Sequence, residues 1–429
     1  MRTTPVQTTT ITTGILRAAL LCAAGCLLVA VAGAAQAGAT ETPAAADAAV
    51  DARFRACLGE LRAAAPASRV RHDSFDAHMP ALEPDPSVLE ALDYQPEFKV
   101  PIWDYLAALV DAERIADGRL RLAGHAAILQ DVQRRYGVDP ATVVAVWGVE
   151  SDYGQTFGKR PLLRSLATLS CAGRRQAFFR GELFSALRIL QDGHVAAEAL
   201  TGSWAGAFGH TQFMPSTFER IAVDFDGDGR RDLVGSVADA LASTANYLKQ
   251  AGWRSGERWG FEVALPDSFD PALAGRKRKR PLSDWAARGV RRIDGSALVA
   301  ADAPAARAAG ILLPAGVDGP AFAVFRNFDA IYSYNAAESY ALAIAVLSDL
   351  LRGGPGIVAE WPTDDPGLSR AERRELQALL VARGHDIGEI DGMIGARSRE
   401  AIGKEQARLG IAGEPRPGRR ILEALRAQR

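Results

Sequence analysis

The feature that most constrains this chain is an apolar run, Thr142-Val-Val-Ala-Val-Trp-Gly-Val-Glu150, which ends in the polar turn Ser151-Asp-Tyr-Gly154. The run predicts a helix with a carboxyl group at its exit. A carboxyl group in that position can lose contact with water, and desolvation raises its pKa. A general acid needs a raised pKa near neutral pH, although an ordinary solvated side chain is the commoner setting for a helical glutamate.

Most of the chain shows the helical spacing of apolar and charged residues. Between residues 253 and 328 the pattern changes to short apolar pieces with Pro and Gly, which indicates a small insertion with strands. We therefore expect a mainly α fold of the α+β class. Outside the apolar run above, the expected helices cover residues 53–66, 101–136, 174–190, 216–223, 237–252 and 339–352.

The N-terminus has the pattern of an export signal over residues 1–37. Basic residues precede an apolar run at 18–31, and the small-residue site Ala35-Gln-Ala37 follows it. Cleavage would leave a mature chain without a membrane helix in an oxidising compartment, and a lipid anchor on Cys26 is the alternative. The net charge of −1 gives no reason to expect nucleic acid as a partner.

The chain is long enough for two or three domains. Residues 38–52 are rich in Ala, Thr, Glu and Pro and predict a flexible leader. A Gly- and Pro-rich stretch at 353–367 predicts a linker. After it, residues 368–429 predict a compact module of three helices, and the first two cover 369–383 and 397–409.

Two cysteines, Cys57 and Cys171, remain once the export signal is set aside. In an exported protein they can form one disulfide that ties an N-terminal helix to the segment after the polar turn. Two buried thiols are the alternative. Neither cysteine lies in the setting of a catalytic nucleophile.

Three separated motifs resemble the membrane-bound lytic transglycosylase B family, whose members cleave the glycan strands of peptidoglycan. They are the turn Glu150-Ser-Asp-Tyr-Gly154, the Gly-rich stretch 202–215, and Phe328-Asp-Ala-Ile-Tyr-Ser-Tyr-Asn335 with Tyr340-Ala-Leu-Ala-Ile344. The resemblance covers roughly residues 54–352. It implies a lysozyme-like catalytic domain over residues 53–352, with Glu150 as the single catalytic acid.

The resemblance also implies the reaction. Glu150 would protonate the oxygen between N-acetylmuramic acid and N-acetylglucosamine and then, as a carboxylate, take the proton of the muramoyl C6 hydroxyl, which gives a 1,6-anhydro product. An ordinary glycosidase needs a second carboxylate. The nearest candidate, Asp152, lies in a turn where it can cap backbone groups instead, and we leave it out of the catalytic set. A hydrolytic muramidase and a non-catalytic wall-binding scaffold remain alternatives.

Six residues would line the groove by their places in the family motifs: Ser203, Gln212, Tyr247, Tyr334, Asn335 and Tyr340. The two tyrosines on apolar helices, Tyr247 and Tyr340, could equally be core residues. Gln212 lies among Gly, Phe and Met, where a buried amide needs a polar partner. Asn335 could orient a sugar N-acetyl group or hydrogen-bond Glu150. Ala337 stands where related sequences often have Ser.

A second chemical pattern, Asp224-Phe-Asp-Gly-Asp-Gly-Arg-Arg-Asp232, matches much of the EF-hand calcium loop. Position 12 is Gly235 instead of Glu, but the family has a longer loop in which Asp239 would close the site. The expected ligands are Asp224, Asp226, Asp228, Asp239 and the Arg230 carbonyl, around a structural Ca²⁺. The alternative is an acidic turn without metal. No organic cofactor is expected.

The C-terminal module resembles the three-helix peptidoglycan-binding domain, through motifs such as Leu376-Gln-Ala-Leu-Leu380 and Asp391-Gly-Met-Ile-Gly395. Ser398 and Glu405 depart from the family's Thr and aromatic residue. Such a module raises the effective concentration of an enzyme on a polymer. We expect peptidoglycan strands as the partner, other cell-wall enzymes as further candidates, and the periplasm as the location. His385 is expected to be a surface residue and not a zinc ligand.

Overall fold

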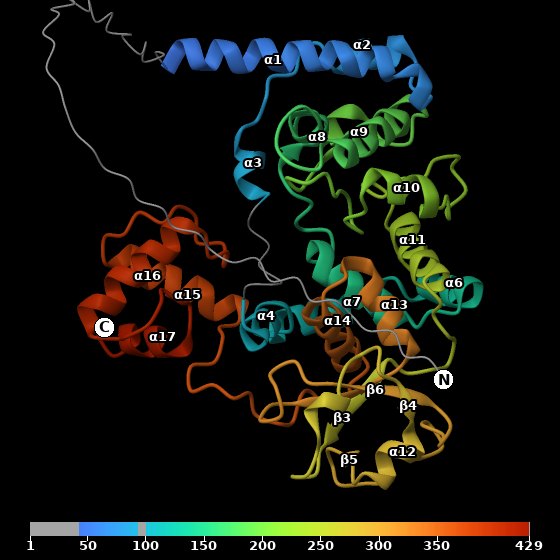
Figure 1. The fold of residues 1–429 in the computed structure, drawn as a ribbon, viewed down its shortest axis with the longest axis vertical. Helices are drawn as coiled ribbons and strands as arrows, with labels where there is room; N and C mark the ends of the chain where they lie inside the picture. The colour runs from blue at the N-terminus through green and yellow to red at the C-terminus, as the bar shows by residue number, and fades with distance from the viewer. Residues whose placement is uncertain (1–42, 93–99, 429) are drawn as a thin grey trace, which may run out of the picture. The chain divides into compact units, whose positions relative to one another are not determined.

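A computed structural model describes residues 43–92 and 100–428 (Figure 1). The predicted export signal and Cys26 lie outside these ranges. The predicted leader begins outside them too, but from Pro43 onwards the chain is helical, as α1 (Pro43–Ala64). Alanine dominates the start of α1 and has the highest helix propensity, which is why the helix begins ten residues before the predicted 53. None of the helices in the described ranges is long and apolar enough to cross a bilayer.

The apolar run forms α7 (Pro140–Ser151), which is buried on almost every side. Pro140 occupies its first turn, and the Asp139 side chain caps it by accepting from the Thr142 amide at 3.0 Å. The helices that pack on α7 are α5 (Ala112–Gly124), α6 (Ala126–Tyr136), α11 (Val237–Gln250) and α14 (Glu338–Leu351). The region predicted as helical at 101–136 is three helices, of which the first is α4 (Ile102–Leu109).

A second core contains helices from before α4 and from after α7 in the sequence. Its members are α1, α2 (His72–His78), α3 (Ser87–Ala91), α8 (Leu162–Cys171), α9 (Gln176–Gln191) and α10 (Pro215–Ile221). Cys57 and Cys171 are joined in a disulfide with their Cα atoms 5.7 Å apart, so the bridge links α1 to the end of α8. Of the two interpretations of these cysteines, the disulfide is confirmed.

The strands within residues 253–328 form one antiparallel sheet in the order β4-β6-β7-β3-β5. Their bounds are β3 (Gly260–Ala264), β4 (Arg280–Pro281), β5 (Arg291–Arg292), β6 (Ala308–Leu312) and β7 (Ala321–Val324). The short helix α12 (Leu282–Ala287) lies beside these strands (Figure 1). Its fully buried Trp285 packs into the same small core. Two more short strands, β1 (Arg160–Pro161) and β2 (Thr201–Gly202), pair with each other.

The strand insertion contains a basic run, Arg276-Lys-Arg-Lys-Arg280, which is partly buried. Arg276 and Lys279 both pair with Asp329, at 2.7 and 3.0 Å, and the Arg276 guanidinium lies over the Tyr332 ring. Lys277 is exposed. The run therefore anchors the strand insertion to α13 (Arg326–Asn335).

The C-terminal module consists of α15 (Arg370–Ala382), α16 (Ala396–Leu409) and α17 (Arg419–Arg426) around a core of leucine and isoleucine. Ser369 and Glu372 form a capping box at the start of α15. His385 is half-buried, with 18% of its side chain exposed, and contacts Glu405 at 2.9 Å, so it lies less openly on the surface than predicted. The reason is that His385 Nε2 lies within hydrogen-bond distance of Glu405 Oε1, and Glu405 is buried in the module.

Most helices end within two residues of their predicted limits, and the mainly helical fold with a small strand insertion is confirmed. Five of the described helices were not predicted: α2, α3, α8, α12 and α13. The last of these carries many aromatic residues and Asn, which are weak helix formers. Three one-turn 3₁₀ helices complete the described structure, at Pro66–Ser68, Ala197–Ala199 and Pro271–Leu273.

Candidate active site

Glu150 lies in the last turn of α7, where the helix emerges from the core. The residues before it, from Ala141 to Gly148, are buried, whereas Glu150 keeps partial access to solvent. The helix ends at Asp152, which has a φ of 49° and whose amide donates to the Gly148 carbonyl. This left-handed C-cap ends the helix two residues after Glu150.

The carboxyl group of Glu150 is desolvated and has one hydrogen-bonding partner among the described residues, the Tyr340 hydroxyl, which donates to its Oε1. Burial raises the pKa of Glu150 to about 8, and the bond from Tyr340 works in the opposite direction because it favours the charged form. No carboxylate contributes to this shift. At neutral pH the group therefore holds its proton, as a general acid must.

Tyr340 belongs to an aromatic cluster that includes two other predicted groove residues. Its ring stacks on Tyr334 with centroids 6.2 Å apart, and Tyr334 lies 4.6 Å from Tyr247. The Tyr334 hydroxyl donates to the Thr211 carbonyl and the Tyr247 hydroxyl to the Ser333 carbonyl, both near 2.7–2.8 Å. The structure thus brings three predicted tyrosines together beside Glu150, from α11, α13 and α14.

The Gly-rich stretch is held against α7 by His210, a residue to which the sequence analysis gave no role. Trp147 donates to His210 Nδ1 at 2.9 Å, and the Ser151 hydroxyl donates to the His210 carbonyl at 2.8 Å. Burial lowers the pKa of His210 to about 4, so the ring is neutral and can accept. A Cβ at Gly154 would lie 2.4 Å from this ring, which makes glycine necessary there.

The remaining groove candidates are less closely grouped. Gln212, at a φ of 48°, donates to the Phe157 and Gly209 carbonyls at 3.2 and 2.9 Å, which supplies the polar partners that its amide needs. The Ser203 hydroxyl accepts from the Ala207 amide and closes its own turn. Asn335 is exposed and, in the described part of the chain, makes no hydrogen bond to Glu150.

Asp152, the alternative second carboxylate, is occupied by cations. Arg370 Nη1 lies 2.5 Å from its Oδ2, and Arg114 Nη2 lies 3.5 Å from its Oδ1. The side chain is 15% exposed. At the C-cap, the Asp152 carboxylate therefore pairs with these two arginines and does not contact the Glu150 carboxyl.

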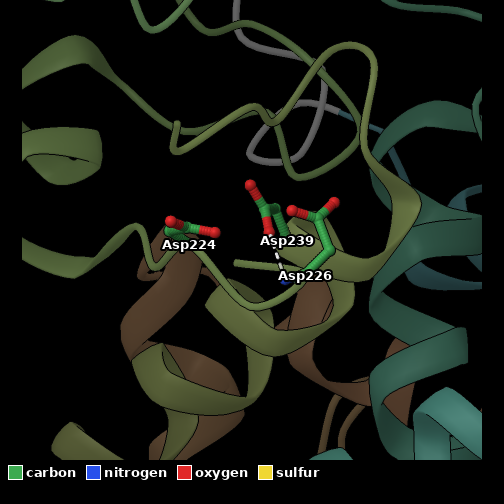
Figure 2. A group of neighbouring side chains, drawn as sticks. All are labelled: Asp224, Asp226 and Asp239. Carbon is green, nitrogen blue, oxygen red and sulfur yellow. Dashed lines mark hydrogen bonds between the residues drawn. The ribbon is translucent and has the colours of Figure 1, made fainter. Parts of the chain in front are cut away.

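The acidic loop gathers three of the predicted metal ligands, Asp224, Asp226 and Asp239, whose carboxylate oxygens lie within 4.8 Å of one another (Figure 2). Asp239 is fully buried, and its Oδ1 also accepts from the Phe225 amide at 2.7 Å. Asp228 is not in this group; its carboxylate accepts from the Arg230 amide at 2.8 Å. Three carboxylates from two segments of chain fit a hard cation such as calcium.

Residues 53–349 match the family model described as transglycosylase SLT domain, which is more than half of the chain. The chain therefore belongs to the transglycosylase SLT family of lysozyme-like enzymes, as its motifs predicted. The membrane-bound lytic murein transglycosylase B of Escherichia coli (strain K12) is 39% identical over 172 residues, which cover 37% of this chain and 47% of that protein. The chain thus spans about half the length of this curated relative.

Solved structures give the same result. SltB3 from Pseudomonas aeruginosa, in complex with NAG-anhNAM-pentapeptide, is 48% identical with a TM-score of 0.70; the match covers 87% of this chain and 99% of that one. The Escherichia coli lytic transglycosylase SLT35, in complex with calcium, is 28% identical with a TM-score of 0.60. The match covers 71% of this chain and 94% of that one. The fold is therefore shared well beyond the catalytic motifs.

Proposed function

We propose that this protein is a lytic murein transglycosylase that cleaves the β-1,4 bond between N-acetylmuramic acid and N-acetylglucosamine in peptidoglycan. The observation that carries the proposal is the single carboxyl group of Glu150, which burial keeps protonated beside Tyr340, while Asp152, the nearest other carboxylate along the chain, is paired with two arginines. The complexes of SltB3 with NAG-anhNAM-pentapeptide and NAG-NAM-pentapeptide support the substrate class.

In the proposed reaction Glu150 acts first as acid and then as base. Its proton passes to the glycosidic oxygen as the bond from that oxygen to the muramoyl C1 breaks. The C6 hydroxyl oxygen of the same sugar then bonds to C1, and the Glu150 carboxylate takes the hydroxyl proton. The acid is regenerated, the product ends in a 1,6-anhydro ring, and no water is consumed. One carboxyl group is enough because the nucleophile belongs to the substrate.

The tyrosine cluster and the Gly-rich stretch would form the groove around the scissile bond. Tyr340 would hold Glu150 in place, since its hydroxyl donates to the carboxyl. Tyr247, Tyr334 and Gln212 would contact sugars beside it, and the exposed amide of Asn335 is free to orient an N-acetyl group. Ser203 belongs to the same proposal through its place in the family motif.

A Ca²⁺ ion would be held by Asp224, Asp226 and Asp239, with Asp228 and the Arg230 carbonyl as the further predicted ligands. The gathering of three carboxylates supports this assignment, and SLT35 is a relative whose structure contains calcium. The ion would supply a fixed positive charge to the acidic loop. Its role would be structural, because these residues lie outside the Glu150–Tyr340 pair.

The periplasm is the compartment that fits this activity, and the Cys57–Cys171 disulfide is consistent with an oxidising location. The relative from Escherichia coli is named as membrane-bound, which agrees with either an exported or a lipid-anchored enzyme. The C-terminal module would hold the enzyme on peptidoglycan, with other cell-wall enzymes as further candidate partners.

The proposal is tested by mass spectrometry of the muropeptides that the wild type and Glu150→Gln release from purified peptidoglycan. Glu90→Gln, at an exposed position on α3, is the control for exchanging a carboxyl for an amide. We expect anhydro ends from the wild type and the control, and none from Glu150→Gln. Reducing muramic acid ends alone would identify a muramidase, and no release by the wild type would favour the scaffold.

A further inference from the structure

Arg370, the first residue of α15, reaches out of the C-terminal module to the turn that follows Glu150. We propose that Arg370 is a positioning residue for the catalytic glutamate, so that the C-terminal module takes part in forming the active site as well as in binding the polymer. This inference rests on the proposed role of Glu150.

The contact is direct and lies close to the catalytic residue in sequence. Arg370 Nη1 donates to Asp152 Oδ2 at 2.5 Å, and Asp152 is two residues beyond Glu150. Asp152 is also the C-cap of α7, in the left-handed conformation that ends the helix. A non-glycine residue with positive φ is held there by its surroundings, so the loss of a partner should loosen the turn.

Arg114 holds the same carboxylate from the protein interior. Its Nη2 lies 3.5 Å from Asp152 Oδ1, and its Nη1 donates to the Gly148 carbonyl at 2.5 Å. The Tyr153 hydroxyl in turn donates to the Arg114 carbonyl at 2.7 Å. Asp152 therefore lies between two guanidinium groups, one from the catalytic domain and one from the C-terminal module. Removing either leaves a poorly hydrated charge with half of its partners.

Other arginines of the C-terminal module bind the catalytic domain without touching this turn. Arg416 pairs with Asp104 of α4, with Nε 2.8 Å from Oδ2, and Arg374 lies 2.5 Å from Glu113 of α5. Arg370 itself also lies 3.5 Å from Asp111. Docking is therefore distributed over several ion pairs, and the loss of one should leave the module in place. A comparison of Arg370 with Arg416 can therefore separate the docking of the module from an effect on Glu150.

The expected consequence is a slower chemical step with unchanged binding. A general acid must lie within hydrogen-bond reach of the glycosidic oxygen, and a misplacement of about 1 Å can cost about a hundredfold in rate. If the turn is loosened but still held by Arg114, the loss in rate should be smaller than this. We expect about a tenfold fall in kcat for Arg370→Gln, with KM nearly constant.

The experiment compares Arg370→Gln, Arg370→Lys and Arg416→Gln in the full chain, on short soluble glycan strands and on insoluble peptidoglycan. We expect Arg370→Gln to lower kcat about tenfold on the short strands, Arg370→Lys to recover part of the loss, and Arg416→Gln to match the wild type. Sedimentation with insoluble peptidoglycan should be equal for all four proteins. Equal losses in Arg370→Gln and Arg416→Gln would overturn the inference in favour of docking alone.

A double-mutant cycle with Asp152→Asn tests whether Arg370 acts through Asp152. If it does, Arg370→Gln should have little further effect on kcat in the Asp152→Asn background. Additive losses would overturn the inference.

Hydrogen exchange provides a readout that does not depend on the reaction. We expect the amides of Asp152 and Gly154 to exchange about tenfold faster in Arg370→Gln than in Arg416→Gln, because both are hydrogen-bonded within this turn. Unchanged exchange would refute the positioning role, whatever the reaction proves to be. A wild type that releases no anhydro ends, with faster exchange in Arg370→Gln, would refute only the proposed activity.

Discussion

Replacing Glu150 with glutamine should stabilise the folded protein, and by an amount that grows with pH. Burial raises the pKa of Glu150 in the folded state to about 8, whereas the ordinary value is 4.5. Below pH 4.5 both the folded and the unfolded chain hold the proton, so Glu150 costs no stability. Between 4.5 and 8 the unfolded chain releases the proton and the folded chain retains it, so the wild type loses stability throughout this window.

The size of the effect follows from the same pKa. Each pH unit in the window is worth about 1.36 kcal/mol, which gives about 3 kcal/mol at pH 7. Partial solvent access at Glu150 reduces this to about 2 kcal/mol. Glutamine is nearly isosteric and its carbonyl can still accept from Tyr340, so the variant removes the charge and keeps the contact. For a chain of this size the midpoint of thermal unfolding should rise by about 2 °C at pH 7.

The assay is thermal unfolding of the wild type, Glu150→Gln and the control Glu90→Gln, followed by near-ultraviolet circular dichroism at pH 5, 6, 7 and 8. The Glu150→Gln variant should gain stability over the wild type steadily along this series, and the control should show no such trend. A stabilisation of equal size at pH 5 and pH 8 would mean that the pKa of Glu150 is not raised, and the argument for a protonated general acid would fail.

Three further perturbations test other parts of the structure. Tyr340→Phe removes a hydrogen-bond donor that favours the charged form of Glu150, so the pKa of Glu150 should rise. The alkaline limb of the pH profile of kcat/KM should therefore move to higher pH, with about a tenfold loss of activity. A limb that does not move would contradict the contact. The double variant Cys57→Ser/Cys171→Ser opens a link across 114 residues of sequence and should lose about 5 kcal/mol in denaturant unfolding, and an unchanged midpoint would show that the bridge contributes nothing. Calcium at a hundredfold excess over its Kd should add about 2.7 kcal/mol to the stability of the wild type and nothing to Asp226→Asn, whereas an equal gain in both would place the ion elsewhere.

Helices with a strong local pattern in the sequence could be predicted, and those held mainly by tertiary contacts could not. The apolar run predicted α7 because eight consecutive buried positions leave a strong pattern in the sequence. In contrast, α13 was missed because its aromatic residues serve the packing of the site and are weak helix formers. Tertiary contacts, such as that of Tyr334 with Thr211, stabilise this helix, and no local pattern records them.

The site was predictable in its residues but not in its contacts. Glu150 and Tyr340 are 190 residues apart, so their hydrogen bond follows from the fold and not from any spacing in the chain. Groove and core are alternatives for Tyr340 in the sequence, yet this residue is 3% exposed and also contacts the carboxyl group. A buried tyrosine can therefore belong to both.

Glu405 shows how the structure accommodates a departure from a family pattern. It is 5% exposed at a position where the family often has an aromatic residue. Three cationic or polar partners surround it: Arg408 at 2.8 Å, His385 at 2.9 Å and Arg383 at 3.7 Å. Burial acts to raise the pKa of Glu405, but the interactions with Arg408 and His385 outweigh it, so the pKa is lowered. The cost of burying the charge is thus offset locally, and the three helices keep their packing.

Glu150 and Asp152 show why two carboxylates in one turn need not form a catalytic pair. The end of α7 falls between them, so Glu150 keeps its helical direction beside the tyrosines while Asp152 takes the left-handed conformation. One carboxyl group is left without a cation and keeps its proton; the other is bound by Arg114 and Arg370. Distance along the chain made Asp152 a candidate, but its carboxylate is paired with Arg114 and Arg370 and does not contact Glu150. This assignment favours a mechanism in which the substrate's own hydroxyl completes the reaction.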